Sequence, residues 1–297
     1  TDDLASTIHE AFRTAVSGRP GPVLVDVPRD VQLELAEFSY PETPGCVIEP
    51  EVLSEETLIN VKRAAELINQ SERPVIIGGH GVVMSRAFDE VKDLAETTGI
   101  PVINTLLGLS GFPRTHELSL GMLGMHGMYW NNMIIEQSDL IIGLGMRFDD
   151  RVTGKASTFA PHARIIHLDI EGSQIGRNVP VEVPLQGDAK SILQSLVPLV
   201  KNVSRPAWMA YINETRDRHP SLAIPSSENL QAQEVLVEIN RLIQENPETV
   251  VVTGVGQHQM WAAQFLEFNN SNTFVSSGGL GTMGFELPAA MGAQLGR

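Results

Sequence analysis

Short apolar runs rich in β-branched residues recur along this chain, and each is followed by glycines or a polar turn and then by a helical stretch. Strands are expected at 74–77, 101–104, 139–143, 164–169 and 181–185. Strands that are apolar throughout and alternate with helices are typical of a parallel sheet that helices cover on both faces. The sequence therefore predicts an α/β fold made of three-layer αβα domains with mostly parallel sheets.

The remaining elements follow from the same spacing of apolar residues and turn residues. They are helices at 4–18, from 54, at 85–98, at 232–246 and from 257, and strands at 22–28, 249–253 and 273–276. Two stretches rich in proline, 38–53 and 201–231, are interpreted as linkers in which no strand is expected.

Composition excludes several functional classes. The 36 acidic and 21 basic residues give a net charge of −15, so the surface repels nucleic acids and anionic membranes. The single cysteine, Cys46, permits neither an intramolecular disulfide nor a CxxC zinc site. No apolar run approaches the roughly 18 residues that cross a bilayer, and no HExxH, GxSxG or phosphate-loop motif occurs. We expect a soluble, cytoplasmic protein that binds neither nucleic acid nor membrane.

The two ends of the chain are unusual. It begins Thr1-Asp2-Asp3 without a methionine, and this acidic start lacks the features of a signal peptide. It stops at Arg297 within a helical pattern of small residues that has no glycine stop. We interpret both ends as internal positions of a longer polypeptide.

Candidate ligand-binding turns follow several predicted strands. Glycines within 78–81 could bring backbone N–H groups close to a phosphate, although a tight turn without a ligand is an equal alternative. Asp169 ends a strand, where its carboxylate could bind ribose hydroxyls or cap a helix. The pair Gly187-Asp188 is a third candidate. Because ligands of open α/β sheets bind along the carboxyl edge, the coincidence of three turns there predicts a nucleotide site.

Other stretches extend these candidates. Two arginines and two aspartates in 147–151 form either a self-neutralising turn or an anion site in which guanidinium groups fork onto phosphates. Methionines near 123–127 either line an aromatic ring or fill a core. In the C-terminal part of the chain, the turn 254–256 has the form of a phosphate cradle, and the glycine-rich stretch 278–284 allows a ligand close to the backbone. Each of these two could equally be a simple turn.

Taken together, these strings resemble the large catalytic subunit of acetohydroxyacid synthase (acetolactate synthase), a thiamine-diphosphate enzyme that also binds FAD. The strings that carry the resemblance are 18–22, 28–30, 123–127, 147–155 (RFDDRVTGK), 255–261 (VGQHQMW) and 277–284. The resemblance covers nearly the whole chain. It implies the architecture of thiamine-diphosphate enzymes, with a central Rossmann-like FAD domain in which the flavin is mainly structural.

The resemblance also implies a domain order. Residues 1–44 would be the C-terminal end of a pyrimidine-binding domain plus a linker, and 45–222 the central FAD-binding domain plus a linker. Residues 223–297 would be the N-terminal part of a diphosphate-binding domain. Family active sites form between two subunits, so a homodimer or higher oligomer is expected, and a smaller regulatory subunit is a further expected partner.

Cofactor contacts are carried over motif by motif. The implied FAD contacts are Arg19, Gly78, Gly79, Gly81, Thr105, Leu106, Leu123, Gly124, Met125, His126, Gly145, Met146, Arg147, Asp149, Arg151, Val152, Asp169, Gly187 and Asp188. The implied thiamine-diphosphate contacts are Val255, Gly256, Gln257, His258, Gly281 and Met283. The family's catalytic glutamate would lie upstream of this chain and its magnesium motif downstream, so no catalytic or metal-binding residue is expected within it.

Three positions depart from the family pattern or bear on it. Arg29 stands where lysine is usual, which keeps the charge and changes the geometry. Glu286 replaces a usual glycine, and a carboxylate at that helix start is expected to disturb the cofactor turn. His80 lies inside the glycine turn, where only Gly79 and Gly81 are expected to need the freedom of glycine.

The implied activity is a transferase reaction of branched-chain amino-acid synthesis. Two pyruvates would give 2-acetolactate with release of CO2, or pyruvate would condense with 2-oxobutanoate, with thiamine diphosphate, Mg²⁺ and FAD as cofactors. A first alternative is another carboligase, oxidase or decarboxylase of 2-oxo acids that uses the same cofactors. A second alternative is that the 297-residue chain acts only as a non-catalytic nucleotide-binding module.

Overall fold

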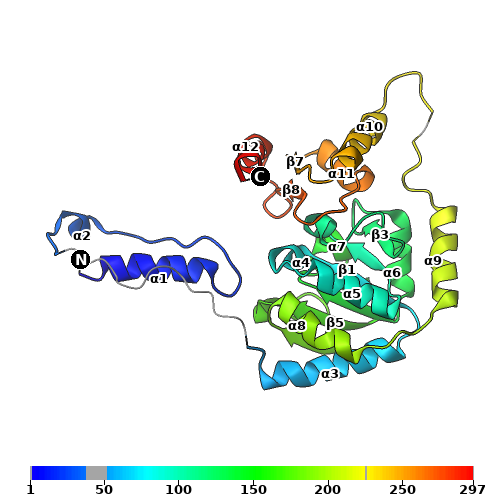
Figure 1. Ribbon diagram of the computed structural model, residues 1–297, viewed down its shortest axis with the longest axis horizontal. Helices are drawn as coiled ribbons and strands as arrows, with labels where there is room; N and C mark the ends of the chain where they lie inside the picture. The colour runs from blue at the N-terminus through cyan, green and yellow to red at the C-terminus, as the bar shows by residue number, and fades with distance from the viewer. Residues whose placement is uncertain (1, 38–51, 225, 297) are drawn as a thin grey trace. The chain divides into compact units, whose positions relative to one another are not determined.

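The computed structural model describes residues 2–37, 52–224 and 226–296 (Figure 1). By its internal contacts the chain divides into two units, Thr1–Val52 and Leu53–Arg297. The second unit is built on a six-stranded sheet in the order β3-β2-β1-β4-β5-β6, and every neighbouring pair in it is parallel. Its strands are β1 (Pro74–Gly78), β2 (Val102–Asn104), β3 (Ser119–Met122), β4 (Leu140–Leu144), β5 (Arg164–Asp169) and β6 (Val183–Gln186).

Helices cover both faces of this sheet, as its continuously apolar strands require. On one face, α3 (Glu55–Gln70), α5 (Phe88–Thr98) and α8 (Ala189–Leu196) share a buried core with Ile76 and Ile142. On the other face, α6 (Tyr129–Gln137) and α9 (Pro206–Arg218) pack against Ile77 and Ile141. The two short helices α4 (His80–Met84) and α7 (Asp150–Thr153) follow β1 and β4. The predicted three-layer αβα arrangement is confirmed for this sheet.

The strand order places a switch point between β1 and β4. From β1 the chain moves outward through β2 to β3, and it then returns to β4 on the other side of β1. This is the order of a doubly wound Rossmann sheet, in which ligands bind outside the carboxyl ends of the strands at the reversal. A ligand is therefore expected near the turns that follow Gly78 and Leu144.

The third block adds a smaller layer. It contains α10 (Ala232–Glu245), β7 (Val251–Thr253), α11 (Gln257–Phe265), β8 (Phe274–Ser276) and α12 (Glu286–Gly296), and β7 pairs with β8 in parallel. Its core is formed with the neighbouring central region, because Leu109 and Met122 pack with Ile243, Leu266 and Phe274. This block thus completes part of its core with residues that follow β2 and lie in β3.

The first unit contains two helices, α1 (Leu4–Val16) and α2 (Arg29–Leu33), neither of which has a buried residue. The strand predicted at 22–28 is wrong, since these residues are irregular. A strand needs a neighbour for its backbone hydrogen bonds, and no other strand lies in the described part of this unit. Residues 38–51 of the predicted linker, including Cys46, lie outside the described residues.

Two further corrections concern the second unit. The linker predicted at 201–231 contains the 13-residue helix α9, which places Trp208 and Ile212 in the core. Strand β3 was not predicted, because Gly121 interrupts its apolar pattern, with a φ of +84° next to a register shift in the pairing with β2. None of the described helices combines the length and the apolar character that crossing a membrane requires.

Arg205 is the N-cap residue of α9, and its side chain links this helix to the C-terminal ends of α3 and α5. Its guanidinium donates to the carbonyl oxygens of Ile68 and Ser71 at the end of α3 and of Thr98 at the end of α5, at 2.7 to 3.0 Å. It also bonds Val203, and the residue is 92% buried, since only 8% of its surface is exposed. A cation at two helix C-termini satisfies unpaired carbonyls and complements both helix dipoles.

We expect Arg205→Met to lower the free energy of unfolding by about 3 kcal/mol, because several buried carbonyls lose a charged donor. The free energy of unfolding of Arg205→Lys should lie between those of the wild type and Arg205→Met, since one ammonium cannot reach all four oxygens. Urea unfolding of the full chain measures both. The matched control is Arg218→Met in the same helix, whose exposed arginine pairs only with Glu214 and should change stability by less than about 0.5 kcal/mol. Equal effects of Arg205→Met and Arg218→Met would contradict this role.

Candidate functional site

The turns after β1 and β4 contact each other directly through their backbones. Gly79 donates its N–H to Leu144 at 2.8 Å, and Gly81 donates to Gly145 at 3.0 Å. A Cβ atom on Gly79 would lie 2.2 Å from the Gly145 carbonyl oxygen, and one on Gly145 would lie 2.4 Å from the Cα of Gly81. These three glycines are therefore required by the contact between the turns. Because the N–H groups of Gly79 and Gly81 are already bonded, other groups would have to bind a phosphate here.

A third turn, after β2, joins the same cluster. Thr105 donates its N–H to Gly78 at 2.9 Å, and the Asn104 side chain donates to the carbonyl of Gly108 at 2.8 Å. A Cβ on Gly108 would lie 2.3 Å from the Gly78 oxygen. Leu106, which follows Thr105, is partly buried against the core of the third block. The turns at the carboxyl ends of β2, β1 and β4 thus form one hydrogen-bonded floor.

The loop after β3 meets the turn after β4 beside this floor. Met125 donates its N–H to the Arg151 carbonyl at 2.9 Å, and the Arg151 guanidinium approaches the Met125 sulfur at 3.6 Å. A Cβ on Gly124, whose φ is +94°, would lie 2.3 Å from the same carbonyl. Arg147 forms an ion pair with Asp149 at 2.8 Å and remains half exposed. The structure therefore brings together predicted site residues that are far apart in sequence.

Methionine and leucine positions in these loops divide into two groups. Leu123 and Met146 are 4% exposed and belong to the core, and Val152 packs against the same core. Met125, in contrast, is 59% exposed beside the exposed Arg151. Of the methionines near 123–127, Met122 and Met128 fill the core, whereas Met125 is exposed.

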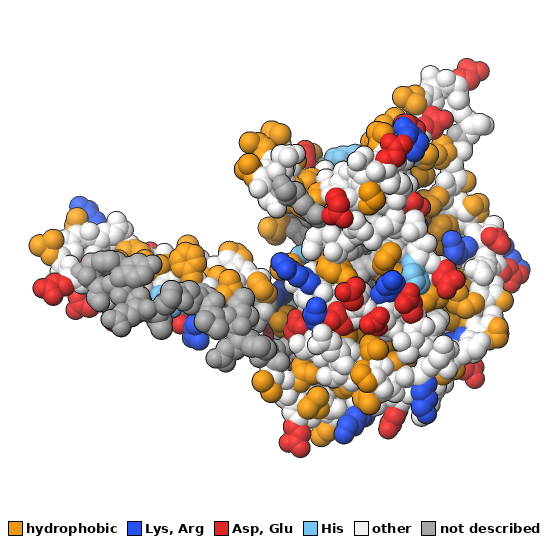
Figure 2. Space-filling model, in the orientation of Figure 1, with side chains coloured by type: hydrophobic (Ala, Val, Ile, Leu, Met, Phe, Trp, Pro, Cys, Tyr) orange, Lys and Arg blue, Asp and Glu red, His pale blue; other side chains and the backbone are white. Residues whose placement is uncertain are grey.

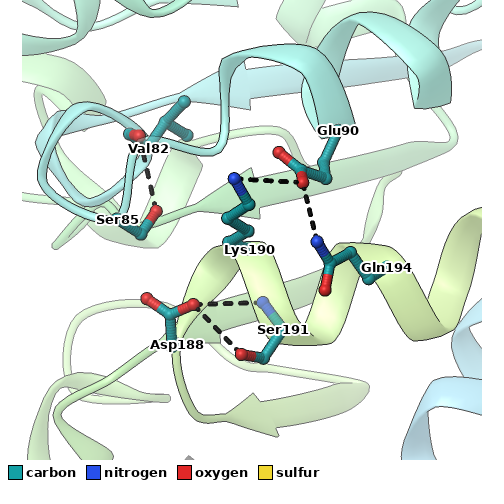
Figure 3. A network of polar contacts seen from close by, with 7 residues as sticks. All are labelled: Val82, Ser85, Glu90, Asp188, Lys190, Ser191 and Gln194. Carbon is teal, nitrogen blue, oxygen red and sulfur yellow. Dashed lines mark hydrogen bonds and ion pairs between the residues drawn. The ribbon is translucent and has the colours of Figure 1, made fainter. Parts of the chain in front are cut away.

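The ends of β5 and β6 carry two aspartates with local partners. Asp169 accepts the N–H of Glu171 at 2.9 Å, and its carbonyl accepts the N–H of Gly187 at 3.1 Å. Asp188 is the N-cap of α8 and accepts from the N–H and the hydroxyl of Ser191 (Figure 3). The helix-cap alternative raised for Asp169 thus describes Asp188 instead, while Asp169 closes its own turn.

A polar link between α5 and α8 lies next to Asp188. Glu90 accepts a hydrogen bond from Gln194 at 2.9 Å and lies 3.6 Å from the Lys190 ammonium (Figure 3). The second oxygen of Glu90 is buried without a hydrogen-bond partner. This link fixes the start of α8, and with it Gly187 and Asp188, relative to α5.

His167 was not predicted as part of the site, yet it orients the turn after β4. It is 1% exposed, and its Nε2 lies 2.7 Å from the Met146 carbonyl oxygen. Because a carbonyl only accepts, Nε2 carries the proton. Burial lowers the pKa of His167, although the bond to Met146 and the nearby Asp169 oppose the shift. Phe148, with a φ of +50°, packs edge-on against the imidazole at 4.9 Å between ring centres.

In the third block, a glycine turn joins β7 to α11. The side chains of Thr253 and Gln259 both bond the Ser276 hydroxyl, at 2.8 and 2.7 Å, and tie this turn to the end of β8. Gly256 has a φ of +152°, and a Cβ there would lie 3.2 Å from Nδ1 of His258. Helix α11 starts at Gln257, so its N-terminal N–H groups border the turn.

The glycine-rich loop after β8 is largely exposed. Gly281 and Gly284 have φ values of +68° and +85°, and Met283 is 79% exposed. Thr282 donates its N–H to the Ser277 hydroxyl at 3.0 Å. At the other end of α11, the Gln264 side chain donates to the carbonyl of His126 at 2.7 Å and links this helix to the loop after β3.

The two candidate regions fit anionic cofactors unequally. At the central sheet, the exposed Arg151 lies beside the exposed Met125, and Arg147 in the same turn is half exposed, which fits a ligand with phosphates and an aromatic ring. At the third block, the carboxylate of Glu286 covers Gly254, with Oε2 only 2.3 Å from where a Cβ would stand. An acid in that position does not fit a diphosphate well.

The remaining candidates lie apart from these regions. Arg19 belongs to the first unit, where it is exposed, as is Arg29. Within 2–37, 52–224 and 226–296, no group of three or more His, Cys, Asp or Glu side chains is arranged to hold a metal ion. On the face shown in Figure 2, basic and acidic side chains of the second unit are intermingled.

The lowered pKa of His167 makes stability depend on pH. The unfolded chain binds a proton at this residue below about pH 6.5, whereas the folded chain binds it only at lower pH, so stability is lost as pH falls through that window. We expect the free energy of unfolding to fall more steeply from pH 7 to pH 5 in the wild type than in His167→Gln. Urea unfolding at several pH values measures this. The exposed His162→Gln is the control, and parallel pH profiles for the wild type and His167→Gln would refute the expectation.

Comparison with known proteins identifies the family to which the chain belongs. Residues 61–196 match the family model described as thiamine pyrophosphate enzyme, central domain, and residues 254–297 match thiamine pyrophosphate enzyme, C-terminal TPP binding domain. The chain is 42% identical to an acetolactate synthase of Mycobacterium leprae, with 100% of the chain covered. It is 42% and 44% identical to the acetolactate synthase large subunits of Corynebacterium glutamicum and Parasynechococcus marenigrum, with 99% covered. In each case the chain spans 48% of the relative, about half of its length. The chain belongs to the thiamine pyrophosphate enzyme family.

Proposed function

We propose that this chain forms the flavin-binding and part of the thiamine-diphosphate-binding region of an acetolactate synthase large subunit. The observation that carries the proposal is the meeting of the 123–127 loop and the 147–152 turn at the carboxyl edge of a doubly wound sheet. The relatives that share about half of their length with the chain bear this name. The whole protein would condense two pyruvates to 2-acetolactate with release of CO2, or pyruvate with 2-oxobutanoate.

The flavin would lie across the floor formed by the turns after β2, β1 and β4. Arg147 and Arg151 supply charge for its pyrophosphate, and the exposed Met125 supplies an apolar surface for an aromatic ring. Asp169 and Asp188 would border its ribose end, held in place by the bonds to Glu171 and Ser191. The other proposed FAD contacts are Arg19, Gly78, Gly79, Gly81, Thr105, Leu106, Leu123, Gly124, His126, Gly145, Met146, Asp149, Val152 and Gly187.

Thiamine diphosphate would lie at the third block. The N-terminal N–H groups of α11 at Gln257 and His258 would face its diphosphate, beside Val255 and Gly256. Gly281 and Met283 belong to the exposed loop that would meet the aminopyrimidine. When bound, this cofactor with Mg²⁺ supplies the chemistry that makes the carbonyl carbon of a 2-oxo acid nucleophilic. The described residues of this chain would bind and orient it.

The wider assignments also stay proposals. They are the domain division at 1–44, 45–222 and 223–297, a homodimer or higher oligomer, a regulatory small subunit and a cytoplasmic location. A second candidate function is a nucleotide-binding module without catalysis, which the hydrogen-bonded turns at the carboxyl edge of the central sheet and the acid at the third block favour for the isolated chain. Another 2-oxo acid carboligase, oxidase or decarboxylase is the third.

We expect the purified chain to bind FAD, and Arg151→Met to weaken that binding by about tenfold, since one charge-assisted contact to phosphate is lost. Titration of flavin fluorescence measures the affinity. Arg164→Met is the matched control, because this exposed arginine starts β5 at the opposite edge of the same sheet. Equal affinities for the two variants would contradict the placement of the flavin.

The activity itself is tested with pyruvate, thiamine diphosphate, Mg²⁺ and FAD, with 2-acetolactate measured by product analysis over a panel of 2-oxo acids. A longer polypeptide that contains this chain is expected to form 2-acetolactate, whereas the 297-residue chain alone is expected to show no turnover. Turnover by the chain alone would refute the hypothesis of a nucleotide-binding module without catalysis. A longer polypeptide that forms other products but no 2-acetolactate would refute the proposed reaction.

A further inference from the structure

Glu286 occupies one side of the turn proposed for the diphosphate. It is the first residue of α12, which packs against β7, and its carboxyl group lies over the Cα of Gly254. Both oxygens and the carboxyl carbon come within 2.8 Å of the position that a Cβ on Gly254 would take. The open side of this glycine, which would let a ligand reach the backbone, is therefore filled by a side chain of the protein itself.

The carboxylate has no compensating partner in the described residues. Its Oε2 is buried without a hydrogen bond, and no ion pair to Glu286 is formed within 52–224 or 226–296. A partly buried carboxylate without an ion-pair partner is weakly screened, so it acts strongly on nearby charges. The charge is thus directed at the turn 254–256 rather than cancelled beside it.

The turn itself attracts anions, so the two effects oppose each other. Helix α11 has nine residues, and its N-terminal N–H groups and dipole favour a negative ligand next to Gly256. A diphosphate bound there would share the turn with the Glu286 carboxylate. Repulsion between like charges across a partly buried site is much larger than across a solvated surface.

Resting on the proposed thiamine-diphosphate site, we propose that Glu286 is a specificity-determining residue that lowers the affinity of the 254–256 turn for diphosphate. The carboxylate occupies the face of Gly254 and repels phosphate, so the chain discriminates against anions at this turn. We assign the effect to the diphosphate rather than to the thiamine part of the cofactor, because the carboxyl group lies over Gly254 of the strand-to-helix turn.

The test compares Glu286→Gln, which keeps the size and removes the charge, with the wild-type chain. Calorimetric titrations use inorganic pyrophosphate, thiamine diphosphate and thiamine as three separate probes. We expect the variant to bind the first two at least about tenfold more tightly, as loss of one nearby like charge predicts. The gain should shrink at high salt, and thiamine should bind no more tightly than to the wild type.

Two further variants serve as controls for charge elsewhere in the chain and for side-chain size at position 286. Glu228→Gln removes one acid from the exposed segment before α10 and should leave all three affinities unchanged. Glu286→Gly removes both the charge and the side chain over Gly254, and should bind pyrophosphate at least as tightly as Glu286→Gln. Thermal unfolding of each variant verifies that α12 stays folded.

The outcomes separate this inference from the proposed function. If the wild type and Glu286→Gln bind pyrophosphate and thiamine diphosphate equally well, the role of Glu286 is refuted and the cofactor site stands. If no variant binds either phosphate probe, both the site in this chain and the role of Glu286 are refuted. A parallel gain for thiamine would also overturn the inference, because it would point to a change of shape rather than of charge.

Discussion

The backbone contact between the turns after β1 and β4 is the constraint on which the rest of the second unit depends. Gly79 and Gly81 bond the carbonyls of Leu144 and Gly145, at distances that leave no room for a side chain on any of the three glycines. This contact closes the switch point of the sheet, where an open crevice would otherwise form. Ligand-binding groups are therefore displaced outward, onto the loop and turn that carry Met125 and Arg151.

Local charges in this protein are set by their immediate surroundings and not by its net charge of −15. Arg205 is buried among helix carbonyls, which accept its hydrogen bonds. Arg147 is paired with Asp149 and half exposed, so it can exchange its partner for a ligand at little cost. Glu286 shows the opposite case, a partly buried acid near the turn where the helix dipole of α11 favours anions.

Much of the central sheet could be predicted, because fully buried strands have a strong apolar signal. The runs at 74–77, 139–143 and 164–169 lie within one residue of β1, β4 and β5. The apolar run at 22–28 forms no strand, since such a run becomes a strand only if a neighbouring strand is available. Helix α9 was missed because only a narrow face with Trp208 and Ile212 is buried, between prolines and polar residues.

The candidate site could be predicted only in part. The sequence indicated which turns lie at the carboxyl edge, but it could not separate glycines that approach a ligand from glycines that approach another turn, because both need the same freedom. Only the distances at Gly79, Gly108 and Gly145 distinguish these roles. His167 carried no signal at all, since a single histidine in an apolar strand is ordinary until its bond to Met146 is seen.

The shared core of the third block has a consequence for how such proteins can be recombined. Leu109 and Met122 come from the central region, yet they pack with Ile243 and Phe274. A crossover between two homologous genes in the segment before α10 would keep every helix and strand intact and still join halves of two different cores. A chimera that folds should therefore inherit the residues that follow β2, together with β3, from the same parent as α10, α11 and β8.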